Sequence, residues 1–198
     1  MIVDTLILAS LSSYRAQLLK KAGLNFFIEG ASFDEREIEK TTKTKDPKKL
    51  SCFLASAKAK NVSNRFPNAL VIGCDQVLDL EGQVFHKVTN KKQAHQRLRD
   101  LSGKIHSLHS AVALFKNGEE IWSEAFSAHM TVRSLSSDFI ECYLARVGTD
   151  ILNSVGVYQI EGEGIQLFEK IDGDFFTILG LPLLPLLIKL RHLGTIDD

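Results

Sequence analysis

Blocks of apolar and polar residues alternate along the chain and predict strands and helices in turn. An apolar run at 6–9 predicts a first strand, and a polar turn at 10–13 leads into helical spacing over 14–22, which Gly23 can close. A second strand is expected at 26–29. Strands interleaved with helices in this way predict an α/β sheet protein.

The next segment combines a charged stretch with a clear helix start. Residues 32–45 are charged, contain Glu35 and are expected to form a loop. Asp46 and Pro47 make a good N-cap and first helical position, and apolar residues recur at helical spacing beyond them. This helix is expected to run to about residue 64.

Asp75 follows a short apolar run at 69–73 that ends abruptly. Such an ending is typical of a buried strand that delivers a carboxylate to its C-terminal edge, so Asp75 is a candidate site residue. Farther along, the pattern predicts a hairpin over 77–85, a helix over 90–101, a long hairpin around Asn117 and Gly118, a helix from Ser136 to 147, short strands with glycine-rich turns, and a leucine-rich helix after Pro182.

Length and charge limit the class of protein. The chain has 198 residues, 44% of them apolar, which is enough for one domain or two closely packed lobes. Its 24 basic residues equal its 24 acidic residues, so no bulk positive field exists to hold a nucleic-acid polymer or an anionic membrane. The expected partner is small, and a bound anion would have to meet locally grouped basic side chains.

The cysteines and the apolar runs favour a cytoplasmic protein. Cys52, Cys74 and Cys142 are odd in number and far apart, so they are interpreted as core thiols rather than as a disulfide framework or zinc ligands. The apolar runs at 5–9 and 178–190 are too short to span a bilayer, and the second is expected to be a buried terminal helix.

Several side chains suit the cleavage of a triphosphate. That reaction needs cations on the phosphate oxygens, a divalent metal, and a carboxylate that holds the metal or accepts a proton from water. Glu35 and Asp75 are acidic candidates, and Arg15, Lys58 and Lys87 are basic candidates. Each has an ordinary alternative, as a solvated base on a helix or an acid that caps a turn, and the residue types alone leave both interpretations open.

Other polar residues give weaker signals. Ser10 lies in a strand-to-helix turn where backbone N–H groups could meet phosphate, but no G-x-S-x-G surrounds it, which excludes a serine-nucleophile elbow. His106 and His109 are interpreted as surface or packing residues rather than metal ligands.

Several short segments follow one another in a definite order along the whole chain. They are LILASLSSYRAQLLKKAGLNF near the start, Asp34 and Glu35, LASAKAKNV from Leu54, IGCDQV from Ile72, the segment around Lys87, LSGKIH from Leu101, and VGVYQIEGEGIQLFEKIDGDFFTILGLPLLPLL near the end. In their order and from end to end of the chain, these segments resemble the Maf family, first described as septum-formation proteins and understood as nucleotide pyrophosphatases.

The resemblance implies a role for each candidate. Asp75 corresponds to a general base that also contacts the metal, and Glu35 to a second acidic residue at that metal, Mg²⁺ or Mn²⁺. Lys58 and Lys87 are included with these two as catalytic residues. The positions that correspond to the grip on the triphosphate are Ser10, Arg15, Lys58 and Lys87.

The same resemblance implies an architecture and an oligomeric state. The expected fold is α/β and similar to the Maf and inosine-triphosphatase group, with an elongated, twisted mixed sheet flanked by helices. The whole chain, 1–198, would form a single pyrophosphatase domain of two lobes with a central cleft. Family members commonly pair, so a homodimer is expected.

Three departures from the family pattern point to the base. Where the family usually has S-P-R-R, this chain has S-S-Y-R, so Tyr14 replaces the first arginine. Gln76 replaces the threonine of the usual D-T, and Glu161 replaces the glutamine of the usual I-Q-G. This trio of Tyr14, Gln76 and Glu161 resembles the branch that acts on 7-methyl-GTP. An aromatic face suits a cationic methylated guanine, at about 0.5 to 2 kcal/mol for a cation–π contact, and a carboxylate can accept from the guanine N1–H and amine.

The residue types leave alternatives open. Tyr14 could be a core aromatic and Glu161 a solvated turn residue. A dTTP or UTP enzyme, a house-cleaning pyrophosphatase of broad specificity, and a non-catalytic nucleotide-binding regulator of septum formation in cell division are the competing functions. Two further positions depart from the family pattern. Val88 replaces a proline after Lys87, which loosens a turn but keeps the lysine. Asn153 with Ser154 replaces an Asp-Lys pair, and this loss of charge bears on substrate preference.

Overall fold

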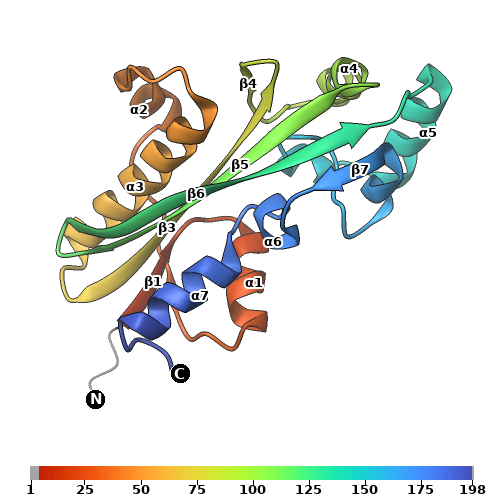
Figure 1. Cartoon of the computed structure of the whole chain (residues 1–198). Coiled ribbons are helices and arrows are strands. Elements are labelled where there is room, and N and C mark those ends of the chain that lie inside the picture. The colour runs from red at the N-terminus through yellow and green to blue at the C-terminus, as the bar shows by residue number, and fades with distance from the viewer. Residues whose placement is uncertain (1–4, 198) are drawn as a thin grey trace. The chain divides into compact units, whose positions relative to one another are not determined.

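The computed structural model, drawn in Figure 1, describes residues 5–197. These residues form two compact units. Within the described residues, unit 1 comprises 5–76, 109–126 and 174–197, and unit 2 comprises 77–108 and 127–173. No helix in this part of the chain is long and apolar enough to cross a membrane.

The helices and strands follow the α/β order expected from the sequence. Unit 1 contains β1 (Thr5–Ala9), α1 (Ser13–Lys21), β2 (Phe27–Ile28), α2 (Glu35–Thr41), α3 (Pro47–Arg65), α6 (Phe175–Ile178) and α7 (Leu183–His192). Unit 2 contains β4 (Gln83–Phe85), α4 (Lys91–Leu101), α5 (Ser137–Val147), the 3₁₀ turns Asp150–Asn153 and Glu163–Leu167, and β7 (Phe168–Asp172). Three long strands contribute residues to both units: β3 (Ala69–Leu80), β5 (Ile105–Lys116) and β6 (Glu119–Val132).

The strands form a mixed sheet, which confirms the expected fold class. The strand order is β2-β1-β3-β5-β6-β7, and β4 pairs with β3. β1 runs parallel to β2 and to β3, whereas the β3–β4 and β6–β7 pairs are antiparallel. The register of β1 on β3 places Ala9 opposite Gly73, just before Asp75.

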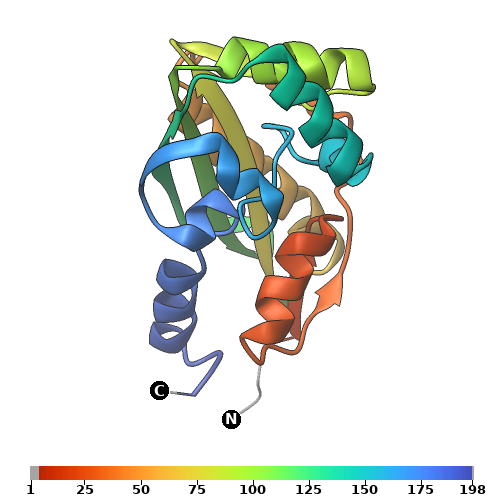
Figure 2. The same cartoon turned by 90° about the vertical axis from the view of Figure 1, so that its right-hand side faces the viewer.

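Alternating side chains of β1 and β3 build two apolar layers in unit 1. Leu8 and Ile72 belong to the cluster that packs against α1 and α7, whereas Ile7 and Val71 belong to the cluster that packs against α3. Figures 1 and 2 show α3 on one face of these strands and helices α1 and α7 on the other. Because strand side chains alternate between faces, Asp75 belongs to the α3 face and Gln76 to the opposite face.

Most of the predicted element boundaries are confirmed. The Asp46 carboxylate caps α3 by accepting from Lys48 N at 2.9 Å, and Ser136 caps α5 by accepting from Phe139 N at 3.2 Å. The β5–β6 hairpin turns at Asn117 and Gly118, with φ of 53° and 76°, as an Asn-Gly turn requires.

Two predictions around the acidic residues are wrong. The stretch interpreted as a loop contains α2, because the Asp34 side chain accepts from Arg36 N at 2.8 Å and acidic residues fill the first turn. Glu35 is therefore the first residue of a helix. β3 also continues past Asp75 to Leu80, because buried Val77 and Leu78 extend the strand, so Asp75 lies inside the strand and not at its end.

Two smaller predictions also fail. Cys74 is buried and Cys52 is half-buried, but Cys142 is exposed on α5 and is not a core thiol. Between α5 and α6 the described chain has 3₁₀ turns and the single strand β7 instead of several short strands, because this segment turns back on itself through glycine positions such as Gly164. A Cβ at Gly164 would lie 2.5 Å from the Gln159 carbonyl oxygen.

Candidate active site

The centre of the candidate site in unit 1 is a lysine shared by two carboxylates. The Lys58 Nζ atom donates to Asp75 Oδ1 at 2.6 Å and lies 2.8 Å from Glu35 Oε2. Lys58 and Asp75 are both buried, with about 8% of each side chain exposed, whereas the Glu35 side chain is 56% exposed. The structure thus brings together three predicted catalytic residues, with one carboxylate open to solvent.

Close packing of α3 on β3 creates this arrangement. A Cβ at Gly73 would lie 2.2 Å from the Ala55 carbonyl oxygen and 2.7 Å from the Ala59 Cβ, so only glycine permits this approach of helix and strand. Lys58 lies on the same stretch of α3 as Ala55 and Ala59, and Asp75 is two residues beyond Gly73 on the same face of β3. The buried ammonium therefore meets the buried carboxylate.

The electrostatic balance at Asp75 favours a proton acceptor. Burial raises the pKa of Asp75 above the usual value of an aspartate, and the nearby Glu35 charge acts in the same direction. The Lys58 and Arg15 charges oppose this and lower the pKa. A raised pKa moves the carboxyl toward the range in which a general base works near neutral pH.

Arg15 is fixed beside this carboxylate by groups just after β1, within β3 and between α6 and α7. Its Nε atom donates to the Gly180 carbonyl at 2.8 Å, and its Nη1 atom donates to the Cys74 carbonyl at 2.9 Å and to Ser10 Oγ at 3.2 Å. Ser10 is buried and also accepts from Ser12 N at 3.3 Å. Within residues 5–197, these hydrogen bonds of Arg15 use Nε and Nη1, which makes Nη2 the candidate donor to an anion.

Gln76 has a structural task on the opposite face of the strand. Its side-chain nitrogen donates to Ser110 Oγ at 2.9 Å, to the Ile178 carbonyl at 2.9 Å and to the Thr177 carbonyl at 3.2 Å. Ser110 Oγ donates to the same Thr177 carbonyl at 2.7 Å. The amide nitrogen is committed to protein acceptors, so a base contact by Gln76 would fall to its carbonyl oxygen.

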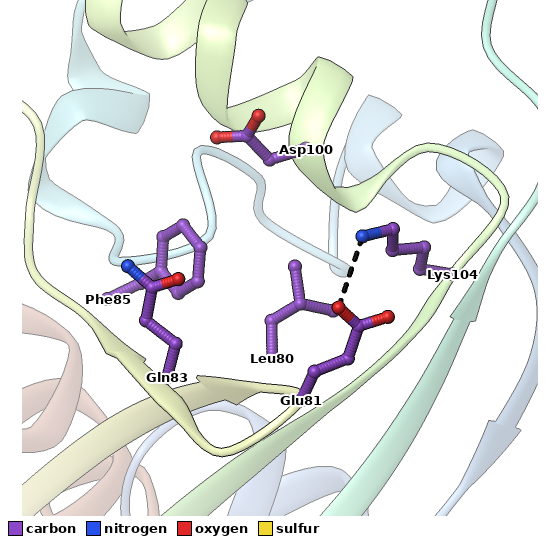
Figure 3. A pocket seen from close by; sticks show the side chains of 6 residues that line it. All are labelled: Leu80, Glu81, Gln83, Phe85, Asp100 and Lys104. Carbon is purple, nitrogen blue, oxygen red and sulfur yellow. Dashed lines mark hydrogen bonds and ion pairs between the residues drawn. The ribbon is translucent and has the colours of Figure 1, made fainter.

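The remaining predicted site residues are Tyr14 in unit 1 and Lys87 and Glu161 in unit 2. Tyr14 is half-buried on α1 of unit 1, next to Arg15. Lys87 and Glu161 belong to unit 2, and both are exposed there. Unit 2 also contains a cavity of about 350 Å³, shown in Figure 3. None of the predicted site residues lines it; its lining residues are Leu80, Glu81, Gln83, Phe85, Asp100 and Lys104.

The two carboxylates fit a magnesium-type site only in part by themselves. Over the described range 5–197, no group of three or more His, Cys, Asp or Glu side chains is placed to hold a metal ion. Glu35 and Asp75 nevertheless converge on one cationic nitrogen. Mg²⁺ commonly binds one or two carboxylates and completes its shell with water and substrate phosphates, so this pair fits an ion that arrives with a polyphosphate.

His106 and His109 are both buried, which confirms packing as their place in the fold. The His106 Nε2 atom lies 2.6 Å from the Tyr158 hydroxyl. Burial, with a smaller effect of the Arg97 charge, lowers the pKa of His106 to about 3, so the ring is neutral near pH 7. Neither histidine belongs to a metal-ligand group in the described chain.

Two residues that shape the structure, Gly73 and Arg97, were not identified from the sequence. Gly73 interrupts a strand pattern, and a glycine there signals a close backbone approach that could have been noticed. Arg97 is buried on α4, but its place in the helical pattern gives no sign of this, because a charged residue beside an apolar stripe is ordinarily solvated.

Comparison with known proteins places the chain in a family. The chain matches the model described as Maf-like protein over residues 5–193. It is 83% identical over 197 residues to the 7-methyl-GTP pyrophosphatase of Bartonella henselae, with 100% of both chains covered. It is 53% identical over 194 residues to the protein of that name from Rhizobium meliloti, covering 97% of this chain and 98% of that one. A HAM1 protein from Coxiella burnetii aligns with a TM-score of 0.45 and 16% identity, over 65% of this chain and 73% of that one. The chain belongs to the Maf family.

Proposed function

We propose that this protein hydrolyses the α–β phosphoanhydride of 7-methyl-GTP to the nucleoside monophosphate and pyrophosphate. The observation that carries the proposal is the buried Asp75 carboxylate, held by the Lys58 ammonium at 2.6 Å with Arg15 close enough to influence its pKa. A buried acid between two fixed cations is a suitable place for a water molecule to lose a proton beside a polyphosphate.

In the proposed reaction, Asp75 orients a water molecule and accepts its proton as the oxygen attacks the α-phosphorus. The bond from that phosphorus to the bridging oxygen breaks, and pyrophosphate leaves. Arg15, tied to the Cys74 and Gly180 carbonyls, would present its free guanidinium edge to phosphate oxygens without further reorganisation. Lys58 would serve both the carboxylates and the phosphates, and Ser10 keeps Arg15 in place.

Glu35 and Asp75 are the residues that would hold Mg²⁺ or Mn²⁺, and such an ion, when bound, supplies positive charge to the pyrophosphate leaving group. The exposed Glu35 carboxylate gives the ion an approach from solvent. Lys87 of unit 2 is proposed as a further phosphate ligand, on the basis of the family resemblance and of its exposed side chain.

The choice of 7-methyl-GTP is supported by the names of the relatives and by three side chains. The Bartonella henselae and Rhizobium meliloti proteins are named 7-methyl-GTP pyrophosphatase, and this chain matches them over nearly their full length. Tyr14 offers an aromatic ring to a cationic base, and Glu161 is an exposed carboxylate that could accept from the guanine edge. Gln76 would contribute through its carbonyl oxygen.

The decisive experiment measures products and selectivity together. Purified protein is incubated with 7-methyl-GTP, GTP, dTTP or UTP and Mg²⁺ or Mn²⁺, and pyrophosphate and orthophosphate are measured separately. We expect pyrophosphate, the highest kcat/KM on 7-methyl-GTP, and a loss of about 10² to 10⁴ in kcat for Asp75→Asn. Equal efficiency on all four nucleotides would indicate a broad house-cleaning enzyme, and faster turnover of dTTP or UTP would indicate that branch. Tight binding without turnover would support a regulator of septation.

Localisation and assembly follow as parts of the same proposal. Free thiols at Cys52, Cys74 and Cys142 suit the reducing cytoplasm, where a nucleotide pyrophosphatase would meet its substrate. A homodimer is proposed from the family resemblance, and sedimentation equilibrium of the purified chain tests it directly.

A further inference from the structure

A buried arginine in unit 2 joins two segments that carry predicted site residues. Arg97 of α4 is 8% exposed, and its guanidinium lies 4.5 Å from the Phe85 ring centroid. Its Nη2 atom donates to the His86 carbonyl at 2.8 Å, and its Nη1 atom donates to the Val155 carbonyl. The planar fork of one side chain therefore holds two backbone carbonyls that are far apart in sequence.

Each carbonyl belongs to a segment with a proposed role. His86 directly precedes Lys87, the proposed phosphate ligand of unit 2. Val155 begins the stretch VGVYQIE, which ends at Glu161, the proposed ligand of the base. The Arg97 hydrogen bonds therefore connect the start of the Lys87 segment to the start of the Glu161 segment.

The second of these segments needs to be held. Val157 has a φ of 60° and is fully buried, a backbone conformation that a β-branched residue adopts only at a cost in energy. Its carbonyl accepts from the Tyr143 hydroxyl at 3.3 Å, and the Tyr158 hydroxyl lies 2.6 Å from His106 Nε2. A strained stretch persists only while its surroundings impose it, so loss of one tie permits the segment to relax.

The charge of Arg97 is costly where it lies. Burial of a guanidinium removes its hydration, and Asp100 is the acidic neighbour that influences it. A shorter or apolar side chain on this helix would avoid that cost but could not donate to both carbonyls. The bonds to His86 and Val155 are thus what the buried charge provides.

We propose that Arg97 is a positioning residue, which fixes the Lys87 and Glu161 segments in one geometry and thereby sets affinity and selectivity for the nucleotide. The proposal rests on the proposed function for the roles of Lys87 and Glu161. Arg97 itself touches no substrate in this scheme and acts through the backbone of the two segments.

The test compares Arg97→Met, which removes both donors, with Arg97→Lys, which keeps the charge but not the fork. Arg99→Met is the matched control, because Arg99 lies on the same helix, is exposed and donates to the Ser137 side chain, at 3.1 Å from Oγ, and not to a backbone carbonyl of either segment in the described chain. Amide hydrogen exchange is followed over 86–89 and 155–161, and KM and kcat are measured for 7-methyl-GTP and GTP.

We expect Arg97→Met to speed exchange at 155–161 and to raise KM for 7-methyl-GTP about tenfold or more, the usual effect of losing hydrogen bonds to a charged group. The kcat should change less, the preference over GTP should fall, and Arg97→Lys should lie between. Because Arg97 would act through the Glu161 segment, adding Glu161→Gln to Arg97→Met should cost less selectivity than it costs in the wild type.

Wild-type exchange and KM in both Arg97 variants would overturn the proposal. The proposal would also be overturned if Arg97→Met lowered kcat equally for 7-methyl-GTP and GTP and its effect added fully to that of Glu161→Gln. That pattern indicates only general damage to the fold. If the wild type hydrolyses none of the nucleotides, the proposed function fails, and the exchange measurement then decides whether Arg97 holds the two segments. If Arg97→Met does not fold, Arg97→Lys supplies the same comparisons.

Discussion

Lys58 Nζ and Asp75 Oδ1 lie 2.6 Å apart in a buried ion pair, and the same ammonium lies 2.8 Å from the exposed Glu35 carboxylate. Breaking a buried pair by removing one partner leaves the other charge uncompensated. We therefore expect Lys58→Met to lower the free energy of unfolding by about 3 kcal/mol at pH 7, measured by urea denaturation.

The double variant Lys58→Met/Asp75→Asn is the internal control for that change. With both charges gone, it should be more stable than Lys58→Met alone. Loss of Lys58 also raises the pKa of Asp75 further, so the folded state binds a proton more readily than the unfolded state, and the stability of Lys58→Met should recover as the pH falls. Identical urea midpoints for Lys58→Met and the wild type would show that the pair does not form in solution.

Glu35→Gln separates metal binding from folding. The Glu35 side chain is 56% exposed, so its ion pair with Lys58 contributes little to stability, about 1 kcal/mol or less. If Glu35 holds the metal, the Mg²⁺ concentration for half-maximal activity should rise about tenfold or more. Glu37→Gln is the matched control, because Glu37 lies on the same helix and forms its ion pair with exposed Lys40, at 2.6 Å. An unchanged Mg²⁺ titration for Glu35→Gln would remove Glu35 from the metal site.

Gly73→Ala tests the close packing that brings Lys58 to Asp75. The new Cβ would lie 2.2 Å from the Ala55 carbonyl oxygen, so α3 must move away from β3. We expect a loss of about 1 to 3 kcal/mol in unfolding free energy and a fall in kcat. Gly30→Ala is the control, because the nearest atoms to its Cβ would be those of the Leu11 side chain, at 3.2 to 3.3 Å, and Leu11 is 80% exposed and can turn away. Equal melting temperatures for the two variants would contradict the packing described above.

His106 predicts a loss of stability in mild acid. Its folded pKa is about 3, whereas an unfolded histidine titrates near 6.5, so protons bind the unfolded chain preferentially between these values. Stability from this group is complete above pH 6.5 and falls as the pH drops, by about 2 kcal/mol between pH 7 and pH 5. Urea unfolding of the wild type and His106→Gln at both pH values checks this. The variant should show a smaller pH effect, and an equal one would assign the acid sensitivity to other groups.

Local signals in the sequence predicted local structure well. Asp46 with Pro47, Ser136, and Asn117 with Gly118 each determine a helix start or a turn through their own backbone chemistry, and the structure has these features where expected. The α2 helix was not predicted because it has no apolar stripe. Its signals are the N-cap Asp34 and the acidic residues of its first turn.

Contacts between residues far apart in the sequence could not be predicted from local signals. The sequence identified Lys58 and Asp75 as separate candidates. Their ion pair depends on how closely α3 approaches β3 at Gly73, which is a property of the packed fold. The hydrogen bonds of Arg97 to His86 and Val155 join segments that no spacing rule connects. The family resemblance supplied roles for the site residues, whereas the structure supplied their partners.

The neighbours Asp75 and Gln76 serve opposite faces of one strand, and β1 pairs with that strand residue by residue from Thr5 with Ala69 to Ala9 with Gly73. A slip of one position in this pairing would exchange the two side chains, placing a carboxylate among apolar leucines and leaving Lys58 opposite an amide. Misregistered molecules would be both inactive and poorly packed. Correct strand alignment during folding is thus a condition for chemistry as well as for stability.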